Sequence, residues 1–313
     1  MLDVRRLRLL RELAHRGTIA AVAEALAFSP SAVSQQLSAL EREAGLPLLE
    51  RTGRRVTLTP AALGLVVHAE AVLARLERAS AELAGARQGL AGPLRIGSYP
   101  SATRAIVPAA LAELARRHPA LEPRVTEVDP AGVAAALRAG ELDVALVHEY
   151  DFVPAEPEPG LAGEPLFTEP MYLAAPAPGT VADQRQAPWI VAPTGTLCHT
   201  MVVRACQAAG FSPRIRHQID DFATVLALVA AGQGVALVPH LGATDPPPGV
   251  ALTRLPTSRR TRTAFRAGAA RHPAVAAFTT ALRTVVPPEL ADGAADPARR
   301  PASASAEEGA GAR

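Results

Sequence analysis

Apolar residues recur every three or four positions between residues 30 and 44, which predicts an amphipathic helix. Ser29 is a suitable N-cap, Pro30 fits the first helical position, and Gly45 fits the end of the helix. The apolar face carries Val33, Leu37, Leu40 and Ala44. The opposite face is polar and bears no charge at its N-terminal end; it carries Ser31, Ser34, Gln35, Ser38 and Arg42.

The segments on either side of this helix predict a helix-turn-helix followed by a hairpin. Asp3 can cap a first helix, and Gly17 with Thr18 ends that helix and caps a short alanine-rich second one. Residues 48–58 read as two short strands around Thr52-Gly53, which is typical of a two-stranded wing. Arginines at its tip can reach phosphates or a narrow minor groove; they are Arg51, Arg54 and Arg55.

This arrangement favours DNA as a partner, because short polar side chains without a carboxylate suit base edges and phosphates. A helix N-terminus adds backbone N–H groups that attract an anion. The alternative is an ordinary amphipathic helix with a solvated polar face. The candidate DNA-binding residues are Thr18, Pro30, Ser31, Ser34, Gln35, Ser38, Arg51, Arg54 and Arg55.

A long helix is predicted from Pro60 to about Gln88, where apolar positions alternate steps of four and three. These positions are Ala62, Val66, Ala69, Leu73, Leu76, Ser80 and Leu83. Such a seam predicts a coiled-coil contact with a second copy of the chain. The alternative is a helix that packs on its own domain.

From residue 93 the pattern changes to strands that alternate with helices, which predicts a doubly wound α/β domain. Residues 142–148 form a nearly continuous apolar run, typical of a strand buried in a parallel sheet. Other strands are predicted at 94–98, 125–128, 171–175, 189–192, 214–218, 234–239 and 262–267, and helices at 103–118, 131–139, 197–209, 222–231 and 273–286. Residues 291–313 contain too few apolar residues to build a core, so they are expected to form a disordered tail.

The N-terminal segment resembles the winged helix-turn-helix of the LysR-type transcriptional regulators. The matching positions are Ala20, Ala21, Leu26, residues 29–41, Gly45, Leu48, Arg51, Arg54, Val56, Leu58 and Thr59. Two positions depart from that family, which usually has Gln-Pro where this chain has Pro30-Ser31, and Phe where Leu49 stands. The first departure alters the groove-facing start of the helix, so the family's base preference is not carried over.

Later motifs resemble the effector domain of the same family; they are Val107-Pro108, His118-Pro119, residues 140–143 and residues 232–239. The resemblance implies two subdomains joined by two crossovers, as in a periplasmic binding protein, with a small ligand between them. It also implies pairing of two chains through the long helix. We expect a DNA-binding domain at 1–59, a linker and dimerisation helix at 60–89, an effector domain at 93–290 and a tail at 291–313. Subdomain I would comprise 93–165 and 268–290, and subdomain II would comprise 166–267.

Charge and composition agree with a DNA-binding protein that is not uniformly basic. The formal net charge is only +2, and every cation other than histidine is arginine. Residues 1–58 hold nine Arg and six acidic residues, an excess of 9 − 6 = +3. The absence of a secretory pattern and of a membrane-length apolar run predicts a cytoplasmic protein without a membrane partner. Two cysteines, Cys198 and Cys206, suit a reducing compartment.

Two predicted strand-to-helix turns, at residues 98–103 and 194–196, carry hydroxyl groups and free backbone N–H groups. In the implied fold both turns face the cleft between subdomains and could hold a carboxylate. Simple N-capping by Ser101 or Thr196, and a solvated His148 at a strand end, are the alternatives. The candidate effector-binding residues are Ser98, Tyr99, Ser101, Thr103, His148, Thr194 and Thr196.

The sequence contains no catalytic, dinucleotide or zinc motif, so we expect neither an enzyme nor a cofactor. Cys198 and Cys206 leave one alternative open, because peroxide-sensing members of the family carry two cysteines in this region. On one intact helix the pair would be separated by about 12 Å, too far for a disulfide. A solute-binding protein and an enzyme of the same fold are disfavoured. The sequence predicts a LysR-type regulator, a homodimer or homotetramer, whose binding to double-stranded promoter DNA responds to a small molecule.

Overall fold

The computed structural model describes residues 1–52, 55–86 and 90–291. Its N-terminal part contains the helices α1 (Val4–Arg16), α2 (Ile19–Ala25) and α3 (Pro30–Ala44), and the hairpin strands β1 (Leu49–Thr52) and β2 (Arg55–Leu58). The side chains of Asp3, Thr18 and Ser29 accept hydrogen bonds from backbone N–H groups at the starts of the three helices. The predicted helix-turn-helix and its caps are confirmed.

The first half of α4 (Pro60–Gly85) belongs to the core of this N-terminal part. Ala62 and Ala69 are fully buried there, and Val66 packs against the same cluster. The prediction that these three residues form a seam with a second chain is wrong. The alternative, a helix that packs on its own domain, is correct for this half, because the small alanine side chains allow α1 to lie close to α4.

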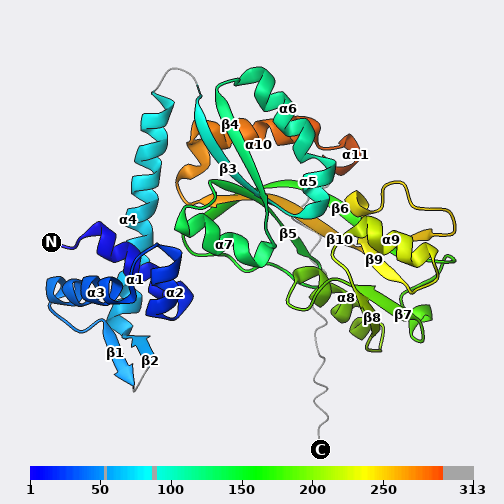
Figure 1. The fold of residues 1–313 in the computed structure, drawn as a ribbon, viewed down its shortest axis with the longest axis horizontal. Helices are drawn as coiled ribbons and strands as arrows, with labels where there is room; N and C mark the ends of the chain where they lie inside the picture. The colour runs from blue at the N-terminus through cyan, green and yellow to red at the C-terminus, as the bar shows by residue number, and fades with distance from the viewer. Residues whose placement is uncertain (53–54, 87–89, 292–313) are drawn as a thin grey trace, which may run out of the picture.

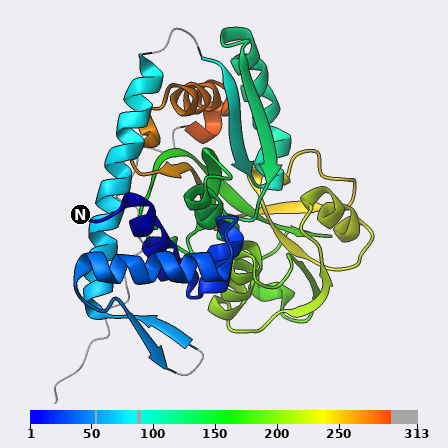
Figure 2. The ribbon, with the colours of Figure 1, turned by 60° about the vertical axis from the view of Figure 1, so that its left-hand side comes forward.

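The second half of α4 runs along the side of the α/β part (Figure 2). Gly268 allows that contact, because a Cβ atom added there would lie 2.3 Å from the carbonyl oxygen of Ala74. Arg266 also binds Glu77 at 3.1 Å. The opposite side of this half leaves an apolar stripe exposed, formed by Val72 (38% exposed), Leu76 (48%) and Leu83 (71%).

A mixed sheet of six strands, in the order β4-β3-β5-β10-β6-β9, forms the centre of the α/β part (Figure 1). Its strands are β3 (Gly92–Ser98), β4 (Leu121–Glu127), β5 (Val144–Tyr150), β6 (Leu161–Ala175), β9 (Ala236–Pro239) and β10 (Ala251–Arg266). Strand β3 is parallel to β4 and β5, whereas β10 is antiparallel to both β5 and β6. The sequence indicated only parts of β6 and β10, because polar residues interrupt their apolar pattern.

Helices cover both faces of this sheet. On one face, α5 (Pro100–Ala105), α6 (Val107–Arg117), α10 (Pro273–Val285) and α11 (Pro288–Ala291) enclose the largest core. On the other face, α7 (Pro130–Ala139) packs on alternate residues of β5, such as Ala145 and Val147. The single helix predicted at 103–118 is wrong: two helices meet at Ile106, where Pro108 follows and lacks a backbone N–H group.

Beyond the central sheet, β7 (Pro188–Val191) and β8 (Arg214–Gln218) form a parallel pair. The helices α8 (Leu197–Ala208) and α9 (Phe222–Ala230) pack nearby, and three short 3₁₀ helices lie at η1 (Ala182–Gln184), η2 (His240–Gly242) and η3 (Ala269–Arg271). The long strands β6 and β10 span both halves of the α/β part. Strand β10 pairs with β5, strand β6 pairs with β9, and β6 and β10 pair with each other. None of the helices in the described ranges is both long enough and apolar enough to cross a lipid bilayer.

Candidate DNA-binding surface and effector cavity

The predicted groove-facing residues of α3 lie at its accessible N-terminal end. Pro30, Ser31 and Gln35 are exposed, whereas Ser34 and Ser38 are half-buried. Ser31 shares a hydrogen bond of 3.0 Å with the capping hydroxyl of Ser29. Thr18 is exposed and caps α2 by accepting from the backbone of Ala21 at 3.1 Å.

The hairpin is fixed to α3 by one carboxylate that the sequence did not single out. Glu41 accepts hydrogen bonds from the backbone N–H groups of Leu48 and Leu49, each at 3.0 Å. These two hydrogen bonds fix the position of the hairpin relative to α3. Arg54 lies outside the described residues, and the side chains of Arg51 and Arg55 are not described, although the backbones of both belong to the paired strands.

A cavity of about 190 Å³ lies where β3, β4 and β5 end and α8 begins. Its lining includes four of the predicted effector-binding residues, Tyr99, Ser101, His148 and Thr196. Ligands commonly bind at the carboxyl ends of parallel strands in α/β folds. These four residues come from segments that are far apart in the sequence, and the sheet topology brings them together.

The other three predicted effector-binding residues lie outside the cavity wall. Ser98 is fully buried and donates to the carbonyl of Tyr99 at 3.4 Å. Thr103 donates to the same carbonyl at 3.1 Å, and exposed Thr194 accepts from Gln218 at 3.4 Å. Each hydroxyl therefore satisfies a local hydrogen bond.

Arg259 is the main cavity residue that the sequence did not indicate. Its guanidinium is 1% exposed, donates to Glu169 at 2.8 Å and donates to Ser101 at 2.9 Å. It also lies 4.8 Å from the centre of the Tyr99 ring. Burial lowers the pKa of Arg259, but the charge of the Glu169 carboxylate outweighs this and raises the pKa above its ordinary value. The inner end of the cavity thus carries a guanidinium that is paired with Glu169 and that orients Ser101.

Acidic side chains occupy other parts of the cavity wall; they are Glu127, Asp129 and Asp220. Asp129 is partly satisfied, because it caps α7 by accepting from Ala131 at 2.9 Å. Burial raises the pKa of Asp220, and the nearby carboxylates of Asp129 and Asp221 raise it further. The cavity therefore has hydrogen-bond donors of the paired Arg259 and of Ser101 at its inner end and an acidic wall, which suits a ligand with an acceptor group at one end and hydrogen-bond donors at the other.

His148 is buried. The alternative that His148 is a solvated histidine at the end of a strand is therefore wrong. Its ring is 4.6 Å from the ring of Tyr99 and 5.1 Å from that of Tyr150, in edge-to-face contacts. Burial lowers the pKa of His148 well below its ordinary value, and the charge of Arg259 lowers it further. The imidazole is therefore neutral at pH 7, and its Nδ1 atom has no hydrogen-bond partner within the described ranges.

The two cysteines lie on α8, and only Cys198 lines the cavity. Burial raises the pKa of Cys198 to about 11 and that of Cys206 to about 12. Both thiols are free and protonated at neutral pH. Within residues 1–52, 55–86 and 90–291, no three His, Cys, Asp or Glu side chains lie close enough together to hold a metal ion.

A winged helix-turn-helix joined to an α/β domain with a cavity at the ends of its parallel strands is the architecture of a DNA-binding protein with a ligand-sensing domain. Residues 4–63 match the bacterial regulatory helix-turn-helix protein of the lysR family, and residues 87–287 match the LysR substrate binding domain. The chain belongs to the LysR family of transcriptional regulators, which bind promoter DNA and small-molecule effectors.

Individual relatives agree with this assignment. The chain is 32% identical to a probable hydrogen peroxide-inducible genes activator of Mycobacterium avium, over 75% of this chain and 76% of that protein. It is 30% identical to the probable regulator LrrA of Synechococcus elongatus, over 93% and 100%. Among solved structures, an OxyR mutant of Corynebacterium glutamicum matches with a TM-score of 0.54 and 27% identity, over 91% and 92%. Full-length OxyR of Pseudomonas aeruginosa, also a mutant, matches with a TM-score of 0.56 and 25% identity, over 91% and 99%.

Proposed function

We propose that the exposed end of α3 and the wing read promoter DNA, and that a small effector in the 190 Å³ cavity controls this binding. Ser31 and Gln35 are placed to reach base edges, because they lie on the exposed first turns of α3. The wing arginines Arg51, Arg54 and Arg55 would contact phosphates or the minor groove. Promoter binding implies that the protein acts in the cytoplasm.

The observation that carries this proposal is that α7 lines the cavity with its first residue and contacts α1 near its other end. Figure 1 shows α7 on the side of the α/β part that faces α1. Pro130, the first residue of α7, lines the cavity. At the other end of α7, Arg8 donates to the carbonyl of Ala139 at 3.0 Å, and Arg16 donates to that of Ala135 at 3.3 Å. Arginines at a helix C-terminus satisfy its free carbonyl groups and interact favourably with its dipole.

One rigid helix thus touches both the effector cavity and the first helix of the DNA-binding domain. A ligand that shifts the start of α7 would move its C-terminal carbonyls relative to Arg8 and Arg16. In this mechanism α7 has two positions, one with and one without the shift. The effector changes DNA binding because it binds one of these positions more tightly than the other. A third contact near the same end, from Arg11 to the carbonyl of Arg138 at 3.4 Å, strengthens the connection.

We further propose that the effector carries a carboxylate, which points toward Ser101 and Arg259. Thr196 caps α8, donating to the carbonyl of Pro193 at 2.9 Å and accepting from the backbone N–H of His199 at 3.1 Å. The start of α8 would add the positive end of a helix dipole. The acidic wall would accept hydrogen bonds from hydroxyl or amino groups elsewhere on the effector. A thermal-shift screen of small organic acids on the full chain would identify it, because a ligand that binds the folded state raises its melting temperature.

The Ser101→Ala and Thr196→Val double variant tests the cavity directly. We expect the ligand-induced change in DNA binding to disappear, while DNA binding without ligand stays at the wild-type level. Titration of labelled promoter DNA with and without the acid found in the screen measures both quantities. A wild-type response in this variant would exclude the cavity as the effector site.

Base reading by α3 has its own test in Gln35→Ala. The loss of a bidentate contact to one base should cost about 1–3 kcal/mol on specific DNA and much less on random DNA. Competition binding with the selected promoter and with scrambled duplexes separates the two. Equal losses on both kinds of DNA would show that Gln35 does not read a base.

The named role of the mycobacterial relative suggests a second candidate, redox sensing through Cys198 and Cys206. Peroxide reacts with the thiolate form of cysteine. Burial keeps both thiols protonated at neutral pH, with pKa values of about 11 and 12. The geometry therefore favours a reversibly bound effector over oxidation of this pair.

A further inference from the structure

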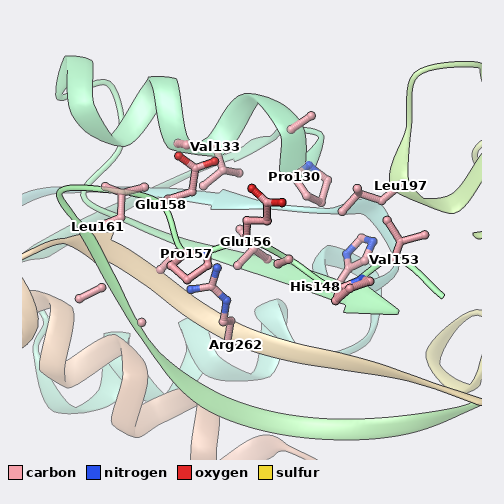
Figure 3. A pocket seen from close by; sticks show the side chains of 18 residues that line it. Pro130, Val133, His148, Val153, Glu156, Pro157, Glu158, Leu161, Leu197 and Arg262 are labelled. Carbon is pink, nitrogen blue, oxygen red and sulfur yellow. The ribbon is translucent and has the colours of Figure 1, made fainter. Parts of the chain in front are cut away.

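A second and larger cavity, of about 430 Å³, lies on the face of the central sheet that α7 covers (Figure 3). One wall of the cavity is the segment 153–158, which connects β5 to β6 and is called the strap below. The cavity shares Pro130, His148 and Leu197 with the effector cavity, and its other lining residues belong to it alone. Its size falls in the range of small-molecule sites, which is about 300–1,000 Å³.

Most of its surface is apolar and belongs to rigid elements. Val133 comes from α7, Val147 from β5 and Leu161 from β6. Leu197 and Val153 close the end nearest His148 (Figure 3). Such a lining suits the body of a small aliphatic or aromatic molecule.

Arg262 brings a positive charge into this apolar cavity from β10 (Figure 3). Its neighbours on the same strand are paired: Arg259 binds Glu169, and Arg260 binds Glu149 and Asp151. The half-buried Arg262 forms no ion pair or side-chain hydrogen bond with any residue of the described ranges. A guanidinium that faces a cavity and has no partner among the described residues is free to bind an anion from outside.

The space around this guanidinium is kept open by a glycine. A Cβ atom at Gly163 would lie 2.9 Å from Nη1 of Arg262 and 2.2 Å from the carbonyl oxygen of Thr263. A larger residue would therefore displace both the guanidinium and the strand backbone. Gly163 is part of the cavity wall, so the open space next to Arg262 belongs to the cavity itself.

The remaining polar groups of the wall leave Arg262 available. The carboxylate of Glu158 forms an ion pair with Arg138, which donates to it at 2.7 Å. Glu156 lies on the strap with an exposed side chain, where water screens its charge. His148 is 8% exposed, and its Nδ1 atom lacks a hydrogen-bond partner among the described residues.

We propose that this cavity is a second ligand site, and that it binds a small carboxylate with an apolar body. Arg262 takes the carboxylate through its guanidinium fork, and Val133, Val147 and Leu161 enclose the apolar body. This site adjoins the effector cavity but has its own cation, because Arg262 lines only the larger cavity and Arg259 lines only the effector cavity.

Calorimetric titration of the full chain with phenylacetate and with isovalerate tests this site, and their amides serve as uncharged controls. We expect the acids to bind and the amides to bind at least about tenfold more weakly, because the charge-assisted contact to Arg262 is lost. Arg262→Gln should weaken the acids by a similar factor. It should leave the melting temperature near the wild-type value, because Arg262 has no partner to lose among residues 1–52, 55–86 and 90–291.

Two further variants locate the ligand. Arg254→Gln, at an exposed position of the same strand, should leave binding unchanged. Glu156→Gln should leave it unchanged or strengthen it, because a nearby negative charge is removed. Ser101→Ala with Thr196→Val alters the effector cavity and should also leave it unchanged.

Three results would overturn the proposal. One is acid binding that is the same in Arg262→Gln as in the wild-type chain. Another is acid binding that is lost in the Ser101→Ala and Thr196→Val variant, since the ligand would then lie in the effector cavity. The third is no binding of either acid below about 10 mM.

Discussion

Replacement of Leu76 and Leu83 by glutamate is expected to convert the protein into a folded monomer. Both side chains belong to the exposed apolar stripe of α4 with Val72, at steps of four and seven residues. These steps place them on one face of the helix, as a coiled-coil contact requires. The buried half of α4 packs within its own domain and does not include them.

The expected loss is large because a twofold interface contains each change twice. Burial of one leucine side chain is worth about 1.5–3 kcal/mol, and a glutamate at its place adds a charge that must be desolvated. The dimer dissociation constant should rise by more than about a thousandfold. Promoter affinity should fall with it, because one DNA-binding domain can occupy only one half-site.

Light scattering over a concentration series measures this effect. Ala71→Glu is the matched control, because it adds the same charge at an exposed position of α4 outside the stripe. It should leave the dimer intact. A dimer of unchanged strength in the Leu76→Glu and Leu83→Glu variant would show that the chains associate through another surface.

Loss of Arg259 is expected to be the most destabilising single change in the α/β part. Arg259→Met would leave Glu169 fully buried without its guanidinium partner, and the removal of one partner of a buried pair costs about 3–5 kcal/mol. The second oxygen of Glu169 would keep only its hydrogen bond from the backbone of Leu241, at 2.7 Å. The melting temperature should fall by several degrees.

A second substitution at Glu169 distinguishes this cause from a general packing defect. Arg259→Met with Glu169→Gln removes the uncompensated charge and keeps an oxygen for the N–H group of Leu241. This double variant should be more stable than Arg259→Met alone. Arg254→Met, at an exposed position of the same strand, should stay within about 0.5 kcal/mol of the wild type. Denaturant unfolding measures all three, and a double variant less stable than Arg259→Met alone would contradict the account.

Local signals explain which parts of the fold the sequence could predict. The N-caps Asp3, Thr18 and Ser29 lie two or three residues from the backbone N–H groups that they bind, so their pattern is visible in a short window. The same holds for Gly17 and Gly45, which adopt the left-handed conformation at the ends of α1 and α3. The DNA-binding domain is built largely from such short-range signals.

The effector cavity depends on contacts that a sequence window cannot contain. Arg259 meets Ser101 across 158 positions and Glu169 across 90. Whether Arg259 faces a cavity or solvent depends on the pairing of β10 with β5 and β6. The spacing of apolar residues in α4 is likewise consistent with packing on a second chain or on its own domain. Its first half packs inward because the core of the N-terminal part lies beside it.

The seven effector candidates illustrate this limit. Ser101 and Thr196 line the cavity, whereas Thr103 and Thr194, which lie within a few residues of them, do not. All four hydroxyls form hydrogen bonds within the protein, so hydrogen bonding alone does not separate the two pairs. A hydroxyl near a helix start is therefore a useful signal for the region of the site. Only the tertiary arrangement shows which hydroxyl faces the ligand.

The link from α7 to α1 is the central claim, and anisotropy titration of promoter DNA tests it directly. The Arg8→Ala and Arg16→Ala variant removes two contacts to the C-terminal carbonyls of α7, and Arg5→Ala, an exposed arginine of α1, is its control. We predict that all three proteins bind DNA and the acid identified by thermal shift. The acid should change DNA affinity only in the wild type and in Arg5→Ala. A full ligand response in the Arg8→Ala and Arg16→Ala variant would contradict the account.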